Sequence, residues 1–250
     1  SMGKKLKVAV VMPAFNAEKT LEKTLNDIPE GVVDDIILVD DVSKDNTVEL
    51  AKKLNIFVFE HQINLGYGGN QKTCYKLALE RGADIVVMIH PDYQYDSSLL
   101  PYLVEQIRHD RFDIMLGSRI RTRKEALAGG MPLYKYLANR ILTLFENIVT
   151  GLDLSEFHTG FRAYSKKSLS IIPYELNSND YVFDSEFLIQ AIALNLRIGE
   201  YPVPVRYFDE ASSPNCFKSI QYGIGTLICV FKFILFRLRI INFKCYQRKS

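Results

Sequence analysis

Polar and acidic residues follow four strand-like runs of the sequence, at the points where the apolar residues end. The first run leads into residues 13–18, the second into 40–45, the third into 64–70 and the fourth into 90–96. In parallel α/β sheets the carboxyl ends of the strands meet at one edge, where ligands bind. We therefore expect these four segments to form one binding site.

The spacing of the glycines excludes two common nucleotide-binding motifs. No G-x-G-x-x-G turn of a dinucleotide dehydrogenase follows the first run, and Gly66, Gly68 and Gly69 come too late and miss that spacing. A G-x-x-x-x-G-K-[ST] loop is also missing. Carboxylate and amide side chains after the fourth run instead indicate a hard divalent cation that bridges a diphosphate.

The segments that position these turns predict a doubly wound, mostly parallel α/β sheet. Apolar runs with the length of strands alternate with segments of helical period. Asp45 stands before the helical segment 47–54 as an N-cap, and Gly82 ends the helical segment 70–81. The predicted strands are residues 7–12, 35–39, 56–59, 85–89 and 113–116.

Beyond Arg119 this alternation stops, although no segment has the composition of a flexible linker. The predicted elements there are a basic loop at 121–131, a helix at 132–149, a polar turn at 155–160, a helix at 184–196 and a strand at 201–207. We therefore predict one α/β domain over residues 4–212 and a C-terminal extension over residues 213–250.

The C-terminal extension has the pattern of an amphipathic helix. Residues 219–231 are uncharged, a run that is too short for the roughly 20 apolar residues of a membrane-spanning helix. Apolar residues share one helical face and basic residues lie off it, which is typical of a helix in the membrane interface. Phe233 and Phe236 fall on the polar side, so packing on the domain or on a second copy of the chain stays open.

The composition is that of an ordinary globular protein, with 48% apolar and 24% charged residues. The net charge of +2 gives no indication of a nucleic-acid partner. Basic residues are concentrated at 119–124 and 232–249, which favours an anionic surface. The four cysteines form no C-x-x-C pair, as expected of reduced thiols. These patterns predict a cytoplasmic protein, peripheral on the cytoplasmic face of a membrane.

Six short motifs occur in an order that resembles one known family. They are PAFNAE (13–18), VDDVSKDNT (39–47), NLGYGGN (64–70), HPDYQYD (90–96), GSR (117–119) and HTGFRAY (158–164). Together they resemble the family 2 inverting glycosyltransferases of the GT-A fold, close to the polyprenyl-phosphate mannose and glucose synthases. The resemblance implies a GT-A domain followed by a C-terminal amphipathic helical extension.

This resemblance implies a site for the nucleotide of a sugar donor. Asp40 or Asp41 would face the base. His90 stands where the family usually has the first Asp of D-x-D, so one anionic group fewer is present there. A second departure is Glu156, near where the synthases have an Asp. The implied nucleotide-binding residues are Pro13, Phe15, Glu18, Asp40, Asp41, Gly66 and His90.

The same resemblance implies a divalent metal site and phosphate-binding arginines. Asp92 matches the second carboxylate of D-x-D and would bind Mg²⁺ or Mn²⁺, with Gln94 beside it. Arg119 and Arg162 would face phosphate groups of the donor or acceptor. Arg206 lies in a segment that only loosely resembles the acceptor loop of the synthases and is a third candidate for the acceptor phosphate.

The implied reaction moves a sugar from a nucleoside-diphosphate sugar, with UDP favoured, and inverts the anomeric carbon. A hydroxyl acceptor needs a general base, for which Asp184 and Glu186 are candidates; the alternative for Asp184 is a helix N-cap. A phosphate acceptor is already ionised, so arginines matter more. Asp92, Asp184, Glu186 and Arg119 are therefore the predicted catalytic residues.

Three functions stay open at this point. A lipid-phosphate or lipid-linked acceptor is favoured, which makes a polyprenyl phosphate and a membrane surface the expected partners beside the nucleotide-sugar donor. A soluble saccharide or protein hydroxyl is the alternative. A non-catalytic scaffold of the same fold is the third possibility, and the intact Asp92, Gln94, Arg119 and Arg162 argue against it.

Overall fold

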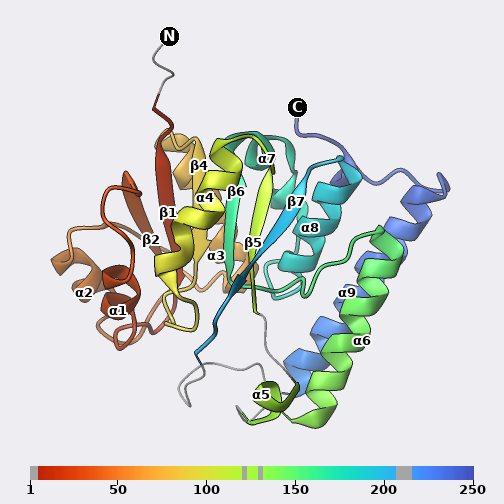
Figure 1. Cartoon of the computed structure of the whole chain (residues 1–250), viewed down its shortest axis with the longest axis horizontal. Helices are drawn as coiled ribbons and strands as arrows, with labels where there is room; N and C mark the ends of the chain where they lie inside the picture. Colours follow the sequence, from red (N-terminus) through yellow and green to blue (C-terminus); the bar gives the residue numbers. More distant parts are fainter. Residues whose placement is uncertain (1–4, 120–122, 129–131, 207–215) are drawn as a thin grey trace.

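One sheet runs through the middle of the protein, with helices on both of its faces (Figure 1). The computed structural model describes residues 5–119, 123–128, 132–206 and 216–250. Within these residues the strands are β1 (Val8–Ala14), β2 (Asp35–Asp40), β3 (Phe57–Glu60), β4 (Ile85–Ile89), β5 (Ile114–Arg119), β6 (Phe161–Ser165) and β7 (Ile198–Val203).

The strand order is β3-β2-β1-β4-β6-β5-β7. All neighbouring strands are parallel except β6, which runs antiparallel to both β4 and β5. Strands β1 and β4 are buried along their whole length, as central strands covered on both faces must be. The predicted doubly wound, mostly parallel α/β sheet is confirmed.

Each face of the sheet is covered by its own hydrophobic core. On one face α3 and α8 contribute Tyr75 and Phe187, and on the other α1 and α4 contribute Leu21 and Leu103, all fully buried. The helices are α1 (Leu21–Asn26), α2 (Thr47–Lys53), α3 (Gly66–Glu80), α4 (Leu100–Arg108), α5 (Arg123–Ala128), α6 (Leu133–Thr150), α7 (Lys166–Ile171), α8 (Phe183–Ala193) and α9 (Cys216–Arg237). Three short 3-10 turns are η1 (Ser97–Leu99), η2 (Tyr174–Leu176) and η3 (Lys244–Tyr246).

The structure differs from the predicted elements at several places, and helix α7 has no counterpart among them. Strand β6 was not predicted, because Arg162 interrupts its apolar pattern. Helix α3 begins four residues before the predicted start at residue 70. Helix α5 lies within the predicted loop at 121–131. Strand β7 is the edge strand Ile198–Val203 rather than 201–207, and Pro202 is tolerated at this edge position.

Close packing explains the early start of α3. A Cβ atom on Gly68 would lie 2.5 Å from the backbone oxygen of Ser178 and 2.8 Å from the Cβ of Phe183. The glycines of the NLGYGGN motif therefore let the first turn of α3 approach the start of α8. Glycines are poor helix formers, which is why this segment was predicted as a loop.

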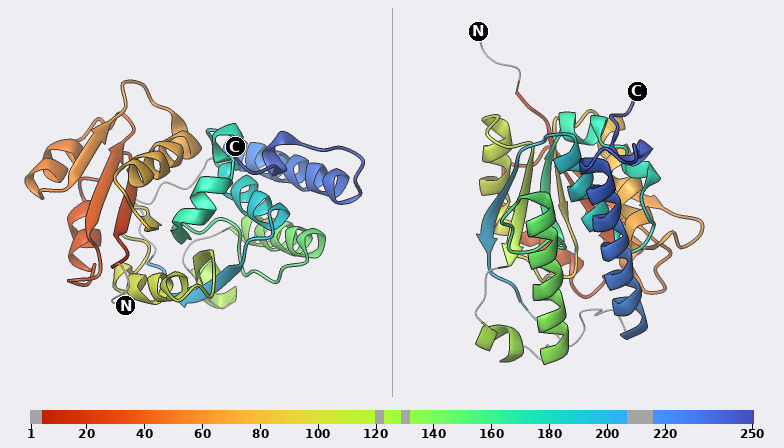
Figure 2. Two further views of the ribbon diagram at one scale, coloured as in Figure 1. Left: turned by 90° about the horizontal axis from the view of Figure 1, so that it is seen from above. Right: turned by 90° about the vertical axis from the view of Figure 1, so that its right-hand side faces the viewer.

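Helices α6 and α9 lie side by side at one end of the sheet, beyond α8 (Figures 1 and 2). In α9 the buried face contains Cys229, Val230 and Phe233, which pack on Ile189 of α8. The opposite face of α9 carries exposed apolar side chains: Ile220, Ile224, Leu227, Ile228 and Phe231. The burial of Phe233 explains an aromatic residue on the side of the helix that was predicted to be polar.

The length of α9 corrects the expectation that this segment is too short to span a membrane. Among the helices that the structure describes, this 22-residue helix alone is long and apolar enough to cross one, by length and composition. Only 22% of its most apolar window is buried inside the protein. The predicted domain boundary at residues 212 and 213 lies outside the described residues.

Candidate active site

The segments after β1, β2 and β4 meet at the carboxyl edge of the sheet, as predicted. Asn16 N donates to Ser43 Oγ at 2.8 Å, and Asn46 N donates to a carboxylate oxygen of Glu18 at 2.8 Å. The Thr20 hydroxyl donates to the backbone oxygen of Pro91 at 2.6 Å. These bonds join the PAFNAE segment to the turns that follow β2 and β4.

Asp40 and Asp41 are both buried at the end of β2, where they organise the surrounding loops. Asp40 accepts a hydrogen bond from Ser43 N at 2.9 Å. Asp41 accepts from Leu65 N at 2.7 Å and from Gly66 N at 3.0 Å, so its carboxylate holds the start of α3. A contact of either residue with a nucleotide base stays a prediction.

Three further residues predicted to bind the nucleotide, Phe15, Pro13 and Gly66, differ in their exposure and backbone conformation. The ring of Phe15 is 52% exposed just beyond β1, where it is free to contact a ligand. Pro13 is buried within β1. Gly66 adopts a φ of +87°, and a Cβ there would lie 2.7 Å from the backbone oxygen of Asn179. Gly66 therefore supplies a backbone conformation that a residue with a side chain rarely adopts.

His90 is half-buried directly after β4, and its ring stacks on Tyr67 with the ring centroids 5.2 Å apart. Its Nε2 lies 3.3 Å from the Tyr67 hydroxyl. Burial lowers the pKa of His90; Asp92 opposes this shift and Arg162 adds to it. The imidazole is therefore neutral at pH 7.

Asp92 and Gln94 form a tight turn after His90. The Asp92 carboxylate accepts a hydrogen bond from Gln94 N at 3.1 Å, and Tyr93 between them has a φ of +62°. Burial raises the pKa of Asp92 above the ordinary value, although His90 and the Gln94 N–H act in the opposite direction. The turn thus presents one carboxylate and one amide, both half-buried.

This donor set fits a divalent cation that a substrate helps to bind. Within the described ranges, no three His, Cys, Asp or Glu side chains are grouped so that they alone could hold a metal ion. Mg²⁺ is commonly bound through one or two carboxylates together with substrate phosphates. Asp92 and Gln94 match that arrangement, provided that a diphosphate supplies further oxygens.

Arg119 at the end of β5 forms an ion pair with Glu156. Arg119 Nε lies 2.9 Å from Glu156 Oε1, and Nη2 lies 2.5 Å from Oε2. Burial alone would raise the pKa of Glu156, but the charge and hydrogen bonds of Arg119 outweigh it and lower the pKa. The Arg119 side chain is 24% exposed. Binding of a phosphate by Arg119 stays a prediction. It requires the guanidinium to bind the phosphate and Glu156 at the same time.

Arg162, the second residue of β6, is turned into the protein and has no exposed surface. Its Nε donates to the backbone oxygen of Thr159 at 2.8 Å, and its Nη2 donates to that of Phe157 at 2.7 Å. Nη2 also lies 3.7 Å from Asp184 Oδ1. The guanidinium therefore holds the HTG segment and Asp184 in place, while its Nη1 has no hydrogen-bond partner among the described residues; a contact with phosphate stays a prediction.

Asp184 and Glu186, the two candidates for a general base, lie on different sides of α8. Asp184 is 2% exposed and accepts hydrogen bonds from the Tyr67 hydroxyl at 2.6 Å and from Gln71 Nε2 at 3.2 Å. These donors belong to α3, and Val182 precedes the helix, so the N-cap alternative for Asp184 is wrong.

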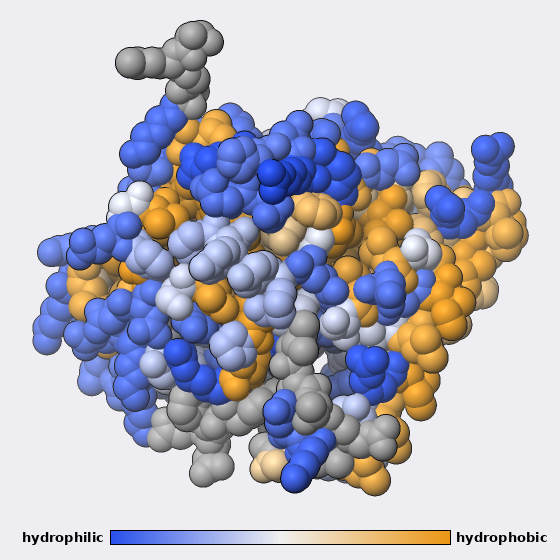
Figure 3. Space-filling view, in the orientation of Figure 1, coloured by the Kyte–Doolittle hydropathy of each residue, from blue (hydrophilic) through white to orange (hydrophobic). Residues whose placement is uncertain are grey.

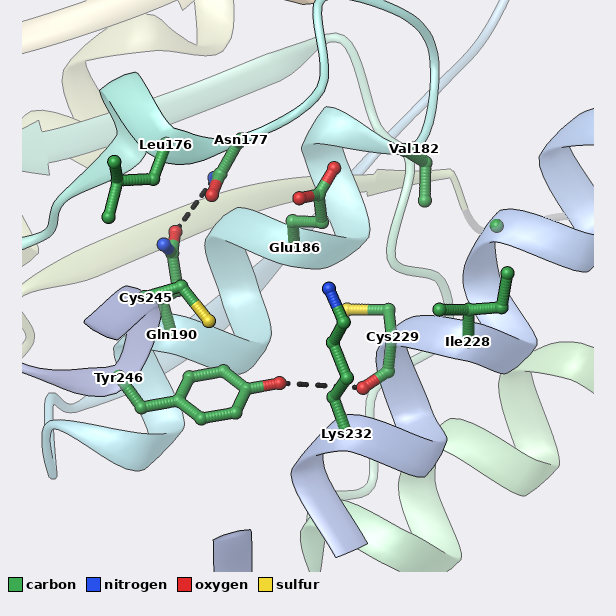
Figure 4. Close-up of a pocket in the computed structure, with 11 residues that line it drawn as sticks. Leu176, Asn177, Val182, Glu186, Gln190, Ile228, Cys229, Lys232, Cys245 and Tyr246 are labelled. Atoms are coloured by element: carbon green, nitrogen blue, oxygen red, sulfur yellow. Dashed lines mark hydrogen bonds between the residues drawn. The ribbon is translucent and has the colours of Figure 1, made fainter. Parts of the chain in front are cut away.

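Glu186 lies away from the Asp92–Gln94 turn. Its carboxylate accepts from Ser178 N at 3.0 Å and lines a cavity of about 210 Å³ between α8, α9 and the C-terminal turn η3 (Figure 4). Burial raises the pKa of Glu186, with Ser178 N opposing the shift. The structure therefore does not bring Glu186 together with Asp92.

Tyr67 is a residue of the site that the sequence analysis did not assign. Its ring lies between the rings of His90 and Tyr181, with centroid distances of 5.2 and 4.9 Å. Its hydroxyl bridges His90 and Asp184. The NLGYGGN motif was recognised, but only its glycines were interpreted.

Arg206 lies beside the Asp92–Gln94 turn. Its backbone N donates to Gln94 O at 2.8 Å, and its guanidinium lies 4.0 Å from the centroid of the Tyr93 ring. Its Nη2 is 3.5 Å from a carboxylate oxygen of Asp27. The structure therefore places a cation next to the predicted metal site, while residues 207–215 of the predicted acceptor loop lie outside the described part.

A mostly parallel sheet with one inserted antiparallel strand, and an acidic turn after its central strand β4, define a GT-A fold. Solved structures of glucosyl-3-phosphoglycerate synthase from Mycobacterium tuberculosis share it. The complex with UDP has a TM-score of 0.67 and 19% identity, with 98% of this chain and 87% of that chain covered. A complex with Mn²⁺, UDP and phosphoglyceric acid has a TM-score of 0.66 and 18% identity, with 95% and 80% covered.

The sequence comparisons give the family. The model described as "Glycosyl transferase family 2" matches residues 9–172, and the chain belongs to this family. A UDP-N-acetylglucosamine–dolichyl-phosphate N-acetylglucosaminyltransferase of Methanococcus voltae is 32% identical over 217 residues, which cover 80% of this chain and 86% of that protein. An undecaprenyl-phosphate mannosyltransferase of Micrococcus luteus is 27% identical over 209 residues, covering 79% and 83%. The family predicted from the six motifs is thereby confirmed.

Proposed function

We propose that the protein transfers a sugar from a nucleoside-diphosphate sugar, with UDP favoured, to the phosphate of a polyprenyl-type lipid, and inverts the anomeric carbon. The observation that carries this proposal is the Asp92–Gln94 turn directly after β4, with two arginines near it: the charge of Arg119 acts to lower the pKa of Asp92, and Arg206 N donates to Gln94 O. The names of the relatives from Methanococcus voltae and Micrococcus luteus support it, since both describe transfer to a polyprenyl-type lipid phosphate.

The donor diphosphate is bound with a divalent cation, Mg²⁺ or Mn²⁺, through Asp92 and Gln94. When bound, this cation offsets the negative charge that develops on the departing nucleoside diphosphate. The exposed ring of Phe15 lies where it can cover the base. The mycobacterial synthase of the same fold has been crystallised with Mn²⁺ and UDP, which supports a divalent cation as the cofactor.

The burial of Asp184 favours a phosphate over a hydroxyl acceptor. A hydroxyl acceptor needs a base that can reach its proton, whereas a phosphate is already ionised at pH 7. Asp184 is 2% exposed and accepts hydrogen bonds from Tyr67 and Gln71, and Glu186 faces another cavity. The planar guanidinium groups of Arg119 and Arg206 are suited to pair with phosphate oxygens.

The protein lies on the cytoplasmic face of a membrane through α6 and α9. The outward sides of both helices face the same direction (Figure 2, right), and the side of α6 forms a hydrophobic band in Figure 3. On α6 the exposed apolar residues are Leu133, Tyr134, Leu137, Ile141, Leu144, Phe145 and Ile148. Two exposed basic residues, Arg237 in the last turn of α9 and Arg239 just beyond it, would meet anionic headgroups, whereas Lys232 lines the cavity beside Glu186. Because Phe233 holds the inner side of α9 against the protein, a helix parallel to the surface fits better than a spanning one.

Transfer assays test the proposal. Full-length protein is mixed with UDP-, GDP- or dTDP-sugars, Mg²⁺ or Mn²⁺, and a polyprenyl phosphate in vesicles, and the glycolipid and the released nucleoside diphosphate are measured. We expect glycolipid from at least one donor. Transfer only to soluble saccharides or proteins would favour the alternative acceptor, and the absence of any transfer would favour a scaffold.

A further inference from the structure

Contacts on two sides fix the orientation of the His90 ring. A Cβ on Gly160 would lie 2.3 Å from His90 Cδ2, so this edge of the imidazole rests directly on the backbone of Gly160. The next ring atom, Nε2, lies 3.3 Å from the Tyr67 hydroxyl, and the two rings stack 5.2 Å apart. The Nδ1 atom therefore lies on the edge of the ring opposite Cδ2, away from Gly160.

The hydrogen bonds of Tyr67 decide which nitrogen of His90 carries the proton. The Tyr67 hydroxyl lies 2.6 Å from Asp184 Oδ2, and the Asp184 carboxylate also accepts from Gln71 and lies 3.7 Å from Arg162. A carboxylate with these partners only accepts, so the phenolic proton goes to Asp184. The Tyr67 oxygen is then the acceptor for His90 Nε2–H, which leaves the lone pair of the neutral ring on Nδ1.

This chain of hydrogen bonds is the usual support of a histidine that binds a metal. Metal-ligating histidines donate their other N–H to a carboxylate, a carbonyl or a water, which fixes the tautomer and the orientation of the ring. Here Tyr67 relays that bond to Asp184. In the described part of the chain, His90 Nδ1 has no hydrogen-bond partner, and Asp92 is close enough to interact with the ring electrostatically.

We infer that His90 Nδ1 and the Asp92 carboxylate together bind the divalent cation, and that the imidazole makes the site select Mn²⁺ over Mg²⁺. Mg²⁺ is bound almost entirely by oxygen ligands, whereas imidazole favours transition-metal ions. The inference rests on the proposed function in one respect, because the diphosphate of the donor supplies further ligands. Tyr67 is a positioning residue in this arrangement, since it acts through His90.

Pulsed electron paramagnetic resonance of Mn²⁺ tests the inference without any measurement of turnover. Full-length protein is loaded with Mn²⁺ and UDP, and the hyperfine coupling of a directly bound imidazole nitrogen is recorded. We expect this coupling in the wild type and in His109→Asn, a control at an exposed histidine. In His90→Asp and His90→Asn the coupling is lost, and the ratio of Mn²⁺ to Mg²⁺ affinity falls about tenfold in His90→Asp.

Tyr67→Phe provides a second variant that keeps the stacked ring and removes only the hydroxyl. We expect it to retain the nitrogen coupling and to bind Mn²⁺ about tenfold more weakly, the usual loss when a supporting hydrogen bond of a metal ligand is removed. Wild-type protein that binds Mn²⁺ and UDP without nitrogen coupling would overturn the inference, as would an unchanged metal preference in His90→Asp. Nitrogen coupling without transfer to any lipid phosphate would support the metal site and remove the proposed acceptor.

Discussion

Asp92 is the one anionic residue of the HPDYQ turn. The next acidic residue, Asp96, caps the 3-10 turn η1 instead. The Asp92 side chain is half-buried, and this burial raises the pKa of its carboxyl group. A bound cation requires the ionised form, so metal affinity falls as the pH drops toward the raised pKa of Asp92. The chemistry of the site thus depends on a single side chain more strongly than in a D-x-D site with two carboxylates.

Replacement of Asp92 tests this dependence. Asp92→Asn keeps the size of the side chain and removes its charge, so we expect turnover to fall by roughly 10²–10³-fold, the loss seen when one group that stabilises developing charge is removed. Excess EDTA should have the same effect on the wild type. Asp110→Asn, at a side chain that is 91% exposed, is the control. Full activity of Asp92→Asn in the glycolipid assay would contradict the predicted metal role.

Gly160 is a second residue with a specific steric role. A Cβ at this position would lie 2.3 Å from His90 Cδ2 and 3.1 Å from Tyr95 Cε2. We expect Gly160→Ala to displace the His90 ring and to weaken the binding of Mn²⁺ with UDP about tenfold, as measured by isothermal titration calorimetry. Gly223→Ala is the matched control, since a Cβ there meets nothing within 4 Å. Equal affinities in both variants would show that the ring does not depend on this contact.

At the scale of the elements, a buried polar cluster joins α6, α8 and α9. Glu146 of α6 is fully buried and accepts from the Ser185 hydroxyl of α8 at 3.2 Å. His158 lies 3.9 Å from the Glu146 carboxylate and is hydrogen-bonded to the Tyr222 hydroxyl of α9. Burial raises the pKa of Glu146 to about 8 and lowers that of His158 to about 4. Both side chains are therefore uncharged near pH 7.

The raised pKa of Glu146 predicts a pH-dependent stability. The unfolded chain loses this proton near pH 4.5 and the folded protein only near pH 8, so the free energy of unfolding falls as the pH rises through this window. Glu146→Gln removes the titration. We expect the variant to be more stable than the wild type at pH 8.5, by roughly 4 kcal/mol at most, and similar at pH 5.

Urea denaturation at the two pH values measures this difference. Glu22→Gln, at an exposed position of α1, is the control and should track the wild type at both. His158 contributes the opposite trend, because its lowered pKa means stability is lost as the pH falls from 6.5 toward 4. His158 is present in the wild type and in Glu146→Gln, so it leaves the difference in stability between them unchanged. A variant that is less stable than the wild type at pH 8.5 would show that Glu146 is not held in its neutral form.

The elements also show what could be predicted from the sequence. Strands β1, β2 and β4 are apolar runs ended by polar turns, so their existence and the edge that they form were predicted; the bounds of β4 match, whereas β1 and β2 extend two residues and one residue further than predicted. Strand β6 was missed because its second residue, Arg162, is paired by backbone oxygens that only the folded HTG segment supplies. Tyr67 was missed because its partners, His90 and Asp184, are 23 and 117 residues away in the chain.

At the scale of the whole molecule, the apolar faces of α6 and α9 give the protein one hydrophobic side. Its membrane contact can be tested by co-sedimentation with liposomes of anionic lipid. Ile141 and Leu144 are 65% and 60% exposed on α6. We expect Ile141→Glu and Leu144→Glu each to lower the partition coefficient at least tenfold, since burial of such a side chain contributes about 1.5–3 kcal/mol.

The control for this experiment is Ile63→Glu, which changes an equally exposed apolar residue far from these helices in the sequence. Binding of the wild type should rise with the fraction of anionic lipid and fall with salt, because basic residues near an anionic surface contribute about 1 kcal/mol each. Wild-type protein that stays in the supernatant at every lipid composition would favour a contact between copies of the chain instead.

The ion pair between Arg119 and Glu156 has a consequence for how such proteins diversify. It joins the two ends of an excursion that leaves the sheet after β5, contains α5 and α6, and returns just before β6. The entropy of closing a loop grows only slowly with its length, by about 0.6 kcal/mol for each doubling. Residues can therefore be inserted into or deleted from this excursion at little energetic cost. The ion pair between Arg119 and Glu156 meanwhile keeps the two ends of the excursion together. Proteins of this family can therefore differ in the length of the excursion while the turns at the carboxyl edge of the sheet keep their places.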